Sequence, residues 1–379
     1  MTHRGRIDYV LFGAFVLMTA FGLVMVYSAS SVVAEMKYQE PSWYFLGRQA
    51  AAAAVAFFAL MYISKRDYRA LQSPGWAFAL LGGVLFLLVL VYFTDAKTHR
   101  WLRLGITQIQ PSELAKPALI IFLAYFVTRR QPAINNRHTL GPAGLALAIL
   151  AATVVVADLG TAVVLMATAA AVFYVAGLRP RYFLVATGAA GICLAIAIAA
   201  KPYRMARIIV YFDPEYKVLR LVDPDRRMLQ YAGSAASSDS GYQARQSLIA
   251  VGSGGLSGEG LMDGRQKLLY LPEAHTDFIY AVVGEELGLI GCAGLLAGFL
   301  VILWRGYRIY WIAADDFGRY LAVGIATSLV FQALMNMTVV LDLMPTKGIP
   351  LPLVSYGGSS LVSSAISLGV LLSVSERAG

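Results

Sequence analysis

The stretch YVLFGAFVLMTAFGLVMVY, from Tyr9 to Tyr27, decides the fold class because it is apolar over the length needed to cross a bilayer. The hydrocarbon core of a membrane is about 30 Å thick, and a helix of about 20 apolar residues spans it. Arg4 and Arg6 precede this stretch and the small residues Ser28–Ser30 follow it, as in a cleaved signal peptide. The apolar part of a signal peptide is shorter, about 7 to 15 residues. We therefore interpret Tyr9–Tyr27 as a retained first span.

The composition agrees with a chain that lies mostly in lipid. Of its residues 58% are hydrophobic and 14% are charged, whereas a soluble domain has about 25% charged residues. Cys193 and Cys292 both fall in apolar segments, which indicates neither a disulfide framework nor a metal cage. No basic run alternates with aromatic residues, so the net charge of +9 favours cytoplasmic loops on anionic lipid over nucleic-acid binding.

Further runs of similar length predict an all-α polytopic membrane protein with about ten transmembrane helices in a single integral membrane domain, residues 1–379. The backbone finds no water inside a bilayer, so such spans are helices. The expected spans are Tyr9–Tyr27, Phe45–Ile63, Trp76–Phe93, Glu113–Val127, Pro142–Ala157, Thr161–Gly177, Tyr182–Ala200, Phe278–Trp304, Tyr320–Met344 and Ser359–Val374.

The short loops predict that both termini are cytoplasmic, because cytoplasmic loops carry an excess of Lys and Arg. With that orientation the inner segments hold Arg4, Arg6, Lys65, Arg66, Arg69, Arg129, Arg130, Arg137, Arg179, Arg181, Arg305, Arg308, Arg319 and Arg377. The short outer loops hold only Lys37, Lys97, Arg100, Arg103 and Lys347. One large extracytoplasmic loop, Lys201–Thr276, lies between helices seven and eight and contains a Ser/Gly stretch, GSAASSDSG.

Two polar clusters border the outer ends of predicted spans. In QPSELAK, Pro111 suits a first helical turn, so Glu113 and Lys116 lie on one helix face and can form an ion pair. This pair is either a structural clasp or part of a cationic site in which Lys116, Arg100 or Arg103 meets an anionic headgroup. Asp158, in ADLGTA, lies at a tight turn between two spans, where it either caps the next helix or has a functional role.

A third cluster, LPEAHTDFIYAVVGEELG (Leu271–Gly288), places carboxylates at the start of a span. Asp277 lies at the lipid–water boundary, where a helix N-terminus favours negative charge. Glu285 lies about 12 Å further along the helix, which favours a structural hydrogen-bonding role. The nearby run Ser253–Gly255 could present backbone N–H groups to a phosphate, although it lacks the GK[ST] of a Walker loop.

These clusters allow three classes of function. The first is an enzyme that acts on a lipid-linked anionic substrate with Asp277 as general base. The second is a transporter or flippase in which the buried charges line the pathway. The third is a scaffold that positions partners. No internal repeat is visible in the sequence, which counts against the transporter.

Five motifs in order resemble the SEDS family (shape, elongation, division and sporulation), and they are closer to its FtsW branch than to its RodA branch. The motifs are RWLRLGITQIQPSELAK, DLGTA, GYQARQSLIAVGSGGLSGEGL, LYLPEAHTDFIYAVVGEELGLIG and LMPTKGIPLPLVSYGGSS. The resemblance implies a peptidoglycan glycosyltransferase that polymerises lipid II at the outer face of the bacterial cytoplasmic membrane, with lipid II flipping as the alternative. It also implies a class B penicillin-binding protein as partner, other divisome or elongasome membrane proteins, and a place at the division septum.

The resemblance assigns the essential acid to Asp277. Asp158 and Glu285 are expected to be functional or structural acids. The expected substrate contacts are Trp101, Arg100, Arg103, Lys116, Glu113, Ser253, Gly254, Gly255 and His275. A divalent cation, Mg²⁺ or Mn²⁺, is expected to accompany the pyrophosphate. One departure from the family pattern is Ala157, which stands where proline is usual.

Overall fold

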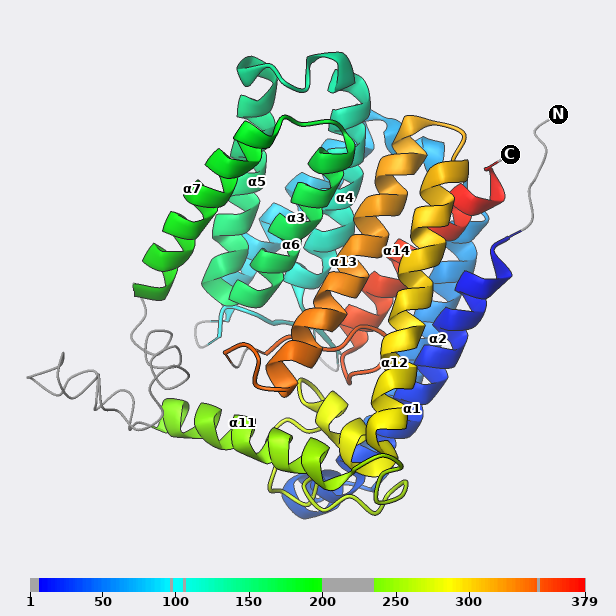
Figure 1. Ribbon diagram of the computed structural model, residues 1–379, viewed down its shortest axis with the longest axis vertical. Coiled ribbons are helices and arrows are strands. Elements are labelled where there is room, and N and C mark those ends of the chain that lie inside the picture. The colour runs from blue at the N-terminus through cyan, green and yellow to red at the C-terminus, as the bar shows by residue number, and fades with distance from the viewer. Residues whose placement is uncertain (1–6, 96–97, 105–106, 200–234, 346–347, 379) are drawn as a thin grey trace, which may run out of the picture.

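The computed structural model describes residues 7–95, 98–104, 107–199, 235–345 and 348–378. Within these ranges each of the ten predicted spans is a helix, which confirms the polytopic fold (Figure 1). The helices are α1 (Tyr9–Tyr38), α2 (Tyr44–Ser64), α3 (Pro74–Thr94), α4 (Pro111–Arg130), α5 (Arg137–Ala157), α6 (Leu159–Val175), α7 (Pro180–Ala199), α12 (Ile279–Ile312), α13 (Asp316–Val340) and α14 (Gly358–Glu376). Arg4, Arg6, Lys97, Lys347 and residues 201–234 lie outside the described residues.

Helices α4, α13 and α14 form the centre of the bundle. In each of them 78% of the most apolar window is buried, against 17% in α5. Small and hydroxyl-bearing residues allow this close packing between helices. On α14, for example, Ser363 Oγ donates to Glu113 O at 2.7 Å and Ser367 Oγ donates to Ser363 O at 2.9 Å, so both buried hydroxyls are satisfied.

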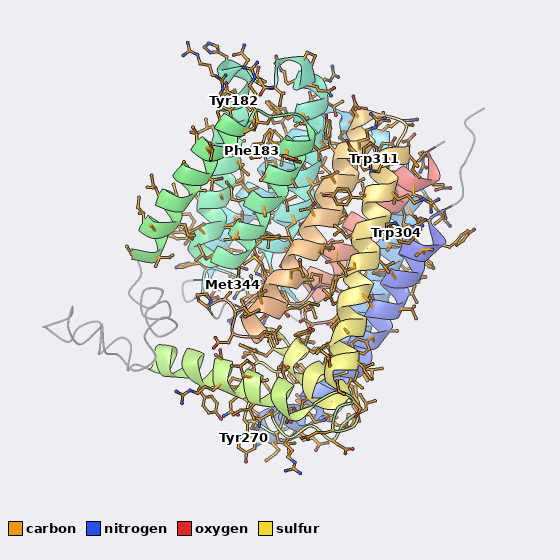
Figure 2. The ribbon with its side chains drawn as sticks, in the orientation of Figure 1. Tyr182, Phe183, Tyr270, Trp304, Trp311 and Met344 are labelled. Carbon is orange, nitrogen blue, oxygen red and sulfur yellow. The ribbon has the colours of Figure 1, made fainter. Side chains whose placement is uncertain are left out.

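The two ends of the bundle differ in what they carry. Both termini and the α2–α3, α4–α5, α6–α7 and α12–α13 connections lie at one end (Figure 1). Exposed aromatic residues occur towards both ends, Trp311 near the terminal end and Tyr270 at the opposite end (Figure 2), as in the aromatic belts of membrane proteins. We call the end opposite the termini the outer end, following the orientation that the basic loops predict.

The outer end contains elements that the periodicity of the sequence did not indicate. Strands β1 (Leu102–Leu104) and β2 (Thr107–Ile109) pair antiparallel, with Arg103 opposite Gln108. Helix α11 (Ala235–Ser253) crosses the outer end below the bundle (Figure 1) and includes most of the predicted Ser/Gly stretch. At the opposite end of the bundle, two short 3₁₀ helices, η1 (Tyr68–Gln72) and η2 (Gln131–Ala133), lie in the connections α2–α3 and α4–α5.

Helix α12 is broken at Gly288, whose φ of 64° and ψ of −161° are not helical. The break leaves backbone groups without helical partners, and the loop after α11 pairs with them. Leu289 N donates to Gly255 O at 2.9 Å, and Glu259 N donates to Glu285 O at 2.9 Å. Irregular backbone at membrane depth is tolerated where protein buries it, so this loop forms part of the folded body.

Candidate functional site

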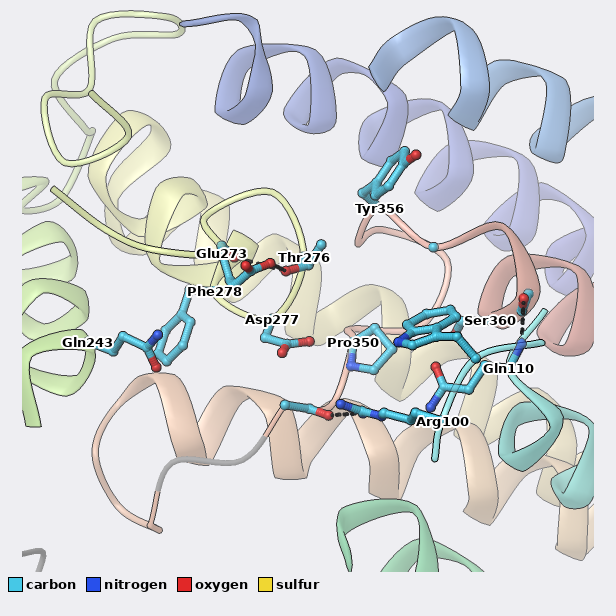
Figure 3. Close-up of a pocket in the computed structure, with 14 residues that line it drawn as sticks. Arg100, Gln110, Gln243, Glu273, Thr276, Asp277, Phe278, Pro350, Tyr356 and Ser360 are labelled. Atoms are coloured by element: carbon cyan, nitrogen blue, oxygen red, sulfur yellow. Dashed lines mark hydrogen bonds between the residues drawn. The ribbon is translucent and has the colours of Figure 1, made fainter. Parts of the chain in front are cut away.

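A cavity of about 400 Å³ lies at the outer end of the bundle (Figure 3). Its walls come from the α3–α4 hairpin, α11, the segment before α12, the α13–α14 loop and the start of α14. The lining residues are Arg100, Trp101, Gln110, Gln243, Glu273, Thr276, Asp277, Phe278, Gly348, Pro350, Tyr356, Gly357, Ser359 and Ser360. Segments far apart in the sequence therefore meet around Asp277.

The backbone fixes Asp277 while its carboxylate stays free of protein donors. Asn336 Nδ2 donates to Asp277 O at 2.7 Å and to Ile349 O at 2.8 Å, which ties the acid's peptide to the α13–α14 loop. Among the described residues none donates a hydrogen bond to the carboxylate oxygens. Burial raises the pKa of Asp277 to about 7, against the opposing effect of the Arg100 charge. A carboxyl group with this pKa suits a general base near neutral pH.

Gly348 lies between Asp277 and Arg100. A Cβ atom at Gly348 would stand 2.6 Å from Asp277 Oδ2 and 3.5 Å from Arg100 Nη1. Only glycine allows this close approach, because any side chain would displace the carboxylate. The acid and the guanidinium thus flank the same point of the α13–α14 loop.

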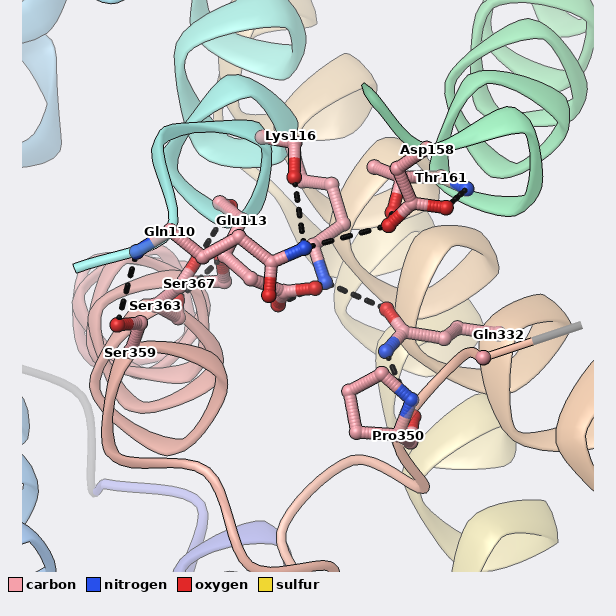
Figure 4. Close-up of polar contacts among 12 residues, drawn as sticks. Gln110, Glu113, Lys116, Asp158, Thr161, Gln332, Pro350, Ser359, Ser363 and Ser367 are labelled. Carbon is pink, nitrogen blue, oxygen red and sulfur yellow. Dashed lines mark hydrogen bonds and ion pairs between the residues drawn. The ribbon is translucent and has the colours of Figure 1, made fainter. Parts of the chain in front are cut away.

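Asp158 caps a helix, as its position predicted, and also pairs with Arg100. It caps α6 through Oδ1, which accepts from Thr161 N at 3.1 Å. Its Oδ2 accepts from Arg100 Nη2 at 3.0 Å and from Gln110 Nε2 at 3.2 Å (Figure 4 shows the Gln110 contact). Arg100 Nη2 also donates to Gly348 O at 2.8 Å. The buried capping residue Asp158 thereby holds the guanidinium of Arg100 in place at the cavity.

The predicted pair of Glu113 and Lys116 is confirmed as a buried clasp (Figure 4). Lys116 Nζ lies 2.6 Å from Glu113 Oε2, and both side chains are buried. Lys116 also donates to Gln332 Oε1, and Gln332 Nε2 donates to Pro350 O at 2.9 Å. Neither member of the pair lines the cavity. The pair supports the cavity wall through Gln332.

The other predicted substrate contacts divide between the cavity and its surroundings. Trp101 lines the cavity, whereas Arg103 is exposed on β1. His275 is buried between aromatic rings, with its ring centroid 4.7 Å from that of Phe45 and 5.6 Å from that of Tyr356. Burial lowers the pKa of His275. The histidine thus packs behind the wall of the cavity.

The glycine run does not reach the cavity. A Cβ at Gly254 would stand 1.9 Å from Gly284 O, so this glycine lets the end of α11 touch α12. Gly255 O accepts at the α12 break, and Ser253 Oγ donates to Ala250 O at 2.8 Å. In this geometry the run serves packing, and the role of Ser253–Gly255 in phosphate binding stays a prediction.

Comparison with known proteins now identifies the family. Residues 8–378 match the sequence profile of the FtsW, RodA and SpoVE family, described as a cell cycle protein. The protein belongs to this family. This is the SEDS family that the motifs resemble, and the match covers almost the whole chain.

Individual relatives of this SEDS protein agree along their full length. The chain is 41% identical over 379 residues to the probable peptidoglycan glycosyltransferase FtsW of Geobacter sp. (strain M18), covering 98% of this chain and 97% of the relative. It is 39% identical over 382 residues to stage V sporulation protein E of Bacillus subtilis (strain 168), covering 99% and 98%.

Solved structures share the fold. The rod shape determining protein RodA of Thermus thermophilus superposes with a TM-score of 0.68 and 26% identity, covering 98% of this chain and 97% of that one. A chain from a peptidoglycan synthase complex, studied for its coordination of polymerisation and crosslinking, superposes with a TM-score of 0.74 and 26% identity, covering 98% of both chains.

Two glutamates of this SEDS protein, Glu285 and Glu286, lie apart from the cavity and hold the loop that leads to Asp277. Glu285 Oε1 accepts from Arg265 N at 2.7 Å and from Gln266 N at 3.0 Å, which confirms a hydrogen-bonding role. Glu286 is fully buried and pairs with Lys267 Nζ at 2.6 Å. Ser28 Oγ of α1 donates to the same carboxylate. Both acids therefore satisfy their charge within the protein.

Sequence reasoning did not single out several residues that line the cavity. They are Gln110, Gln243, Glu273, Thr276, Phe278, Gly348, Pro350, Tyr356, Gly357, Ser359 and Ser360. Many of them fall inside the motifs RWLRLGITQIQPSELAK and LMPTKGIPLPLVSYGGSS, so the signal was present. The sequence alone does not show that the fold brings these segments together around Asp277.

The residues present give limited support to the predicted divalent cation. In the described part of the chain no three His, Cys, Asp or Glu side chains gather into a metal cage. Mg²⁺ commonly binds through one or two carboxylates together with substrate phosphate oxygens. The expectation of Mg²⁺ or Mn²⁺ thus concerns the complex with substrate, and the described residues do not form a site for the ion alone.

Proposed function

We infer that this SEDS protein is a peptidoglycan glycosyltransferase that polymerises lipid II into glycan strands. One observation carries the mechanism. Asp277 presents to a cavity at the outer end a carboxylate to which no described residue donates, with Arg100 on the other side of Gly348. An acid held in this way can take a proton, and a cation beside it can stabilise negative charge that develops on a leaving group.

The reaction needs one base and one anion-stabilising wall. A sugar hydroxyl of the acceptor attacks the anomeric carbon of the donor, the bond from that carbon to the pyrophosphate oxygen breaks, and Asp277 takes the hydroxyl proton. An α-linked donor gives a β-linked polymer, so the displacement inverts and forms no covalent enzyme intermediate. A single acid is sufficient because pyrophosphate leaves without strong protonation. General base catalysis of this kind contributes roughly 10²- to 10⁴-fold.

Arg100 carries positive charge towards the leaving anion. Its guanidinium is held by Asp158 Oδ2 and Gly348 O, so it is oriented before substrate binds. Donors that are already oriented stabilise developing charge without reorganisation. Asp158 therefore acts as a positioning residue, and Glu113 and Lys116 support the neighbouring wall through Gln332.

The setting of this reaction follows from the orientation of the bundle. We propose that the protein lies in the bacterial cytoplasmic membrane with its cavity facing outward, and that it works at the division septum with other divisome proteins. A class B penicillin-binding protein is the proposed partner, which fits the likeness to a chain from a peptidoglycan synthase complex. A divalent cation that accompanies the pyrophosphate is also proposed.

Polymerisation of purified lipid II by the purified full-length protein tests this function, with and without the transpeptidase and with and without a chelator. We expect glycan strands from the native protein and none from Asp277→Asn. Glu259→Gln is the matched control, since Glu259 is an exposed acid of the same outer segment that does not line the cavity. Movement of lipid II across vesicles without any polymer would instead support the flippase.

A further inference from the structure

The first turn of α14 opens into the cavity. Gly357 is the N-cap residue and provides no side-chain cap, and Gly357, Ser359 and Ser360 all line the cavity. The first N–H groups of a helix have no partners within the helix and carry partial positive charge, which favours anions. With 19 residues, α14 is long enough for this charge to be developed.

A side chain satisfies the N–H group of the N-cap residue. Gly357 N donates to Gln49 Oε1 at 3.1 Å. Among the described residues no acceptor faces the N–H groups of Gly358, Ser359 and Ser360, whereas the next one, Leu361 N, donates to Gly357 O inside the helix. Within the described part of the chain three backbone donors of the first turn are therefore free, and two of them belong to the lining residues Ser359 and Ser360.

The side chain of Ser360 adds an independent observation. It is 6% exposed, it lines the cavity, and its Oγ has no hydrogen-bond partner among the residues that the structure describes. Leaving a buried hydroxyl unpaired costs about 1–3 kcal/mol, so such groups usually have a partner in the working state. The neighbouring hydroxyl of Ser359 is used differently, since it accepts from Gln110 N at 3.1 Å.

The cavity separates its acids from these donors. Figure 3 shows Glu273 and Gln243 on one side and Ser360 and Gln110 on the other, with Asp277 between them. An anion near Glu273 and Asp277 would meet like charge, whereas an anion at the start of α14 would meet N–H and O–H donors. In an inverting displacement the attacking hydroxyl and the leaving group also lie on opposite faces of the reacting carbon.

We propose that the N-terminal turn of α14, with the N–H groups of Gly358–Ser360 and the hydroxyl of Ser360, binds the diphosphate of the lipid-linked donor. This assignment rests on the proposed function, since it takes the donor to be a lipid diphosphate. In this proposal the N–H groups of α14 bind the phosphate groups, a role that the sequence predicted for the backbone N–H groups of Ser253–Gly255. Arg100 then faces the same anion from the hairpin side.

The test measures binding separately from chemistry. The full-length Asp277→Asn protein in detergent is titrated with a polyprenyl diphosphate and, as reference, with the polyprenyl monophosphate. Ser360→Ala removes the hydroxyl, and Ser364→Ala is the matched control. Ser364 Oγ is also buried and unpartnered one turn further along α14, but it does not line the cavity.

A second pair of variants tests the backbone donors. Gly358→Pro deletes one N–H at the first helical position, which proline tolerates. Gly358→Ala keeps the N–H while placing a Cβ at the same point, 3.3 Å from Ala52 Cβ, so it sets the packing baseline. The difference in diphosphate affinity between the two variants therefore measures the contribution of the N–H group at position 358.

The proposal expects Ser360→Ala to weaken diphosphate binding about 10-fold and Gly358→Pro to weaken it about 10-fold beyond Gly358→Ala. Ser364→Ala should bind as the parent does. Tight diphosphate binding that neither Ser360→Ala nor Gly358→Pro changes would overturn the subsite and leave the proposed function standing. Selective losses in a protein whose native form makes no polymer from lipid II would support the subsite and count against the proposed function.

Discussion

Two groups of carboxylates lie within ten residues of each other and have opposite surroundings. Glu285 and Glu286 accept hydrogen bonds from backbone N–H groups, Lys267 and Ser28. The carboxylate of Asp277 accepts none from the described residues, although the residue is half-buried at the wall of a cavity. The same functional group is thus structural where the protein satisfies it and reactive where the protein leaves it for substrate. The following predictions test this difference.

The largest expected effect is on activity at Asp277. Asp277→Ala should lower lipid II polymerisation by at least 100-fold, since it removes the base. The melting temperature in detergent should not fall, because the carboxylate accepts no hydrogen bond from the described part of the fold. The measurement is glycan-strand synthesis at equal protein levels. Near-normal product would show that Asp277 is a structural acid, as Glu285 and Glu286 are, and would contradict its assignment as the base.

Lys267→Met should have the largest effect on stability. It leaves Glu286 buried without its cation, which costs about 3–5 kcal/mol, and it should lower the melting temperature accordingly. Combining it with Glu286→Gln should recover most of the loss, because both charges are then absent. A double variant as unstable as Lys267→Met alone would show that the two residues do not act as a pair.

The pH dependence should follow Asp277. Its pKa of about 7 is raised by burial, so the base is protonated below that value and polymerisation should rise about tenfold from pH 6 to pH 8. The folded state binds the extra proton, so this group makes stability fall as pH rises from about 4 to 7. Better folding therefore does not account for the rise. A rate of polymerisation that does not change between pH 6 and pH 8 would contradict the assignment of Asp277 as the base.

The smallest expected effect is at Glu285. Glu285→Gln keeps an acceptor but removes the charge that strengthens its bonds to Arg265 N and Gln266 N. The loss is about 1 kcal/mol, which should speed hydrogen exchange of these two amides about fivefold, with polymerisation close to normal. A loss of polymerisation as large as that of Asp277→Ala would mean that Glu285 takes part in chemistry.

Local patterns predicted the parts of the molecule that local physics determines. The ten spans follow from runs of apolar residues, and the ion pair of Glu113 and Lys116 follows from their spacing on a helix that begins at Pro111. Asp158 as a cap follows from a polar residue at a tight turn. In each case the partners are close in sequence.

Contacts between distant segments could not be predicted in this way. The bond between Ser28 and Glu286 joins residues 258 positions apart, and Arg100 meets Gly348 only through the packing of the hairpin on the α13–α14 loop. The glycine run Ser253–Gly255 illustrates this limit. A cluster of glycines allows both anion binding and close packing of backbones, and only the position of α12 decides between them.

The break at Gly288 also constrains how the chain length can vary. Backbone bonds from Glu259 N to Glu285 O, Gly260 N to Glu286 O, Leu289 N to Gly255 O and Ile290 N to Leu256 O hold the two segments in one register. A residue inserted between Gly255 and Gly260 would leave some of these groups unpaired, so the length of this stretch is fixed. Insertions and deletions within the family should therefore be excluded from it and accumulate elsewhere in the long outer segment.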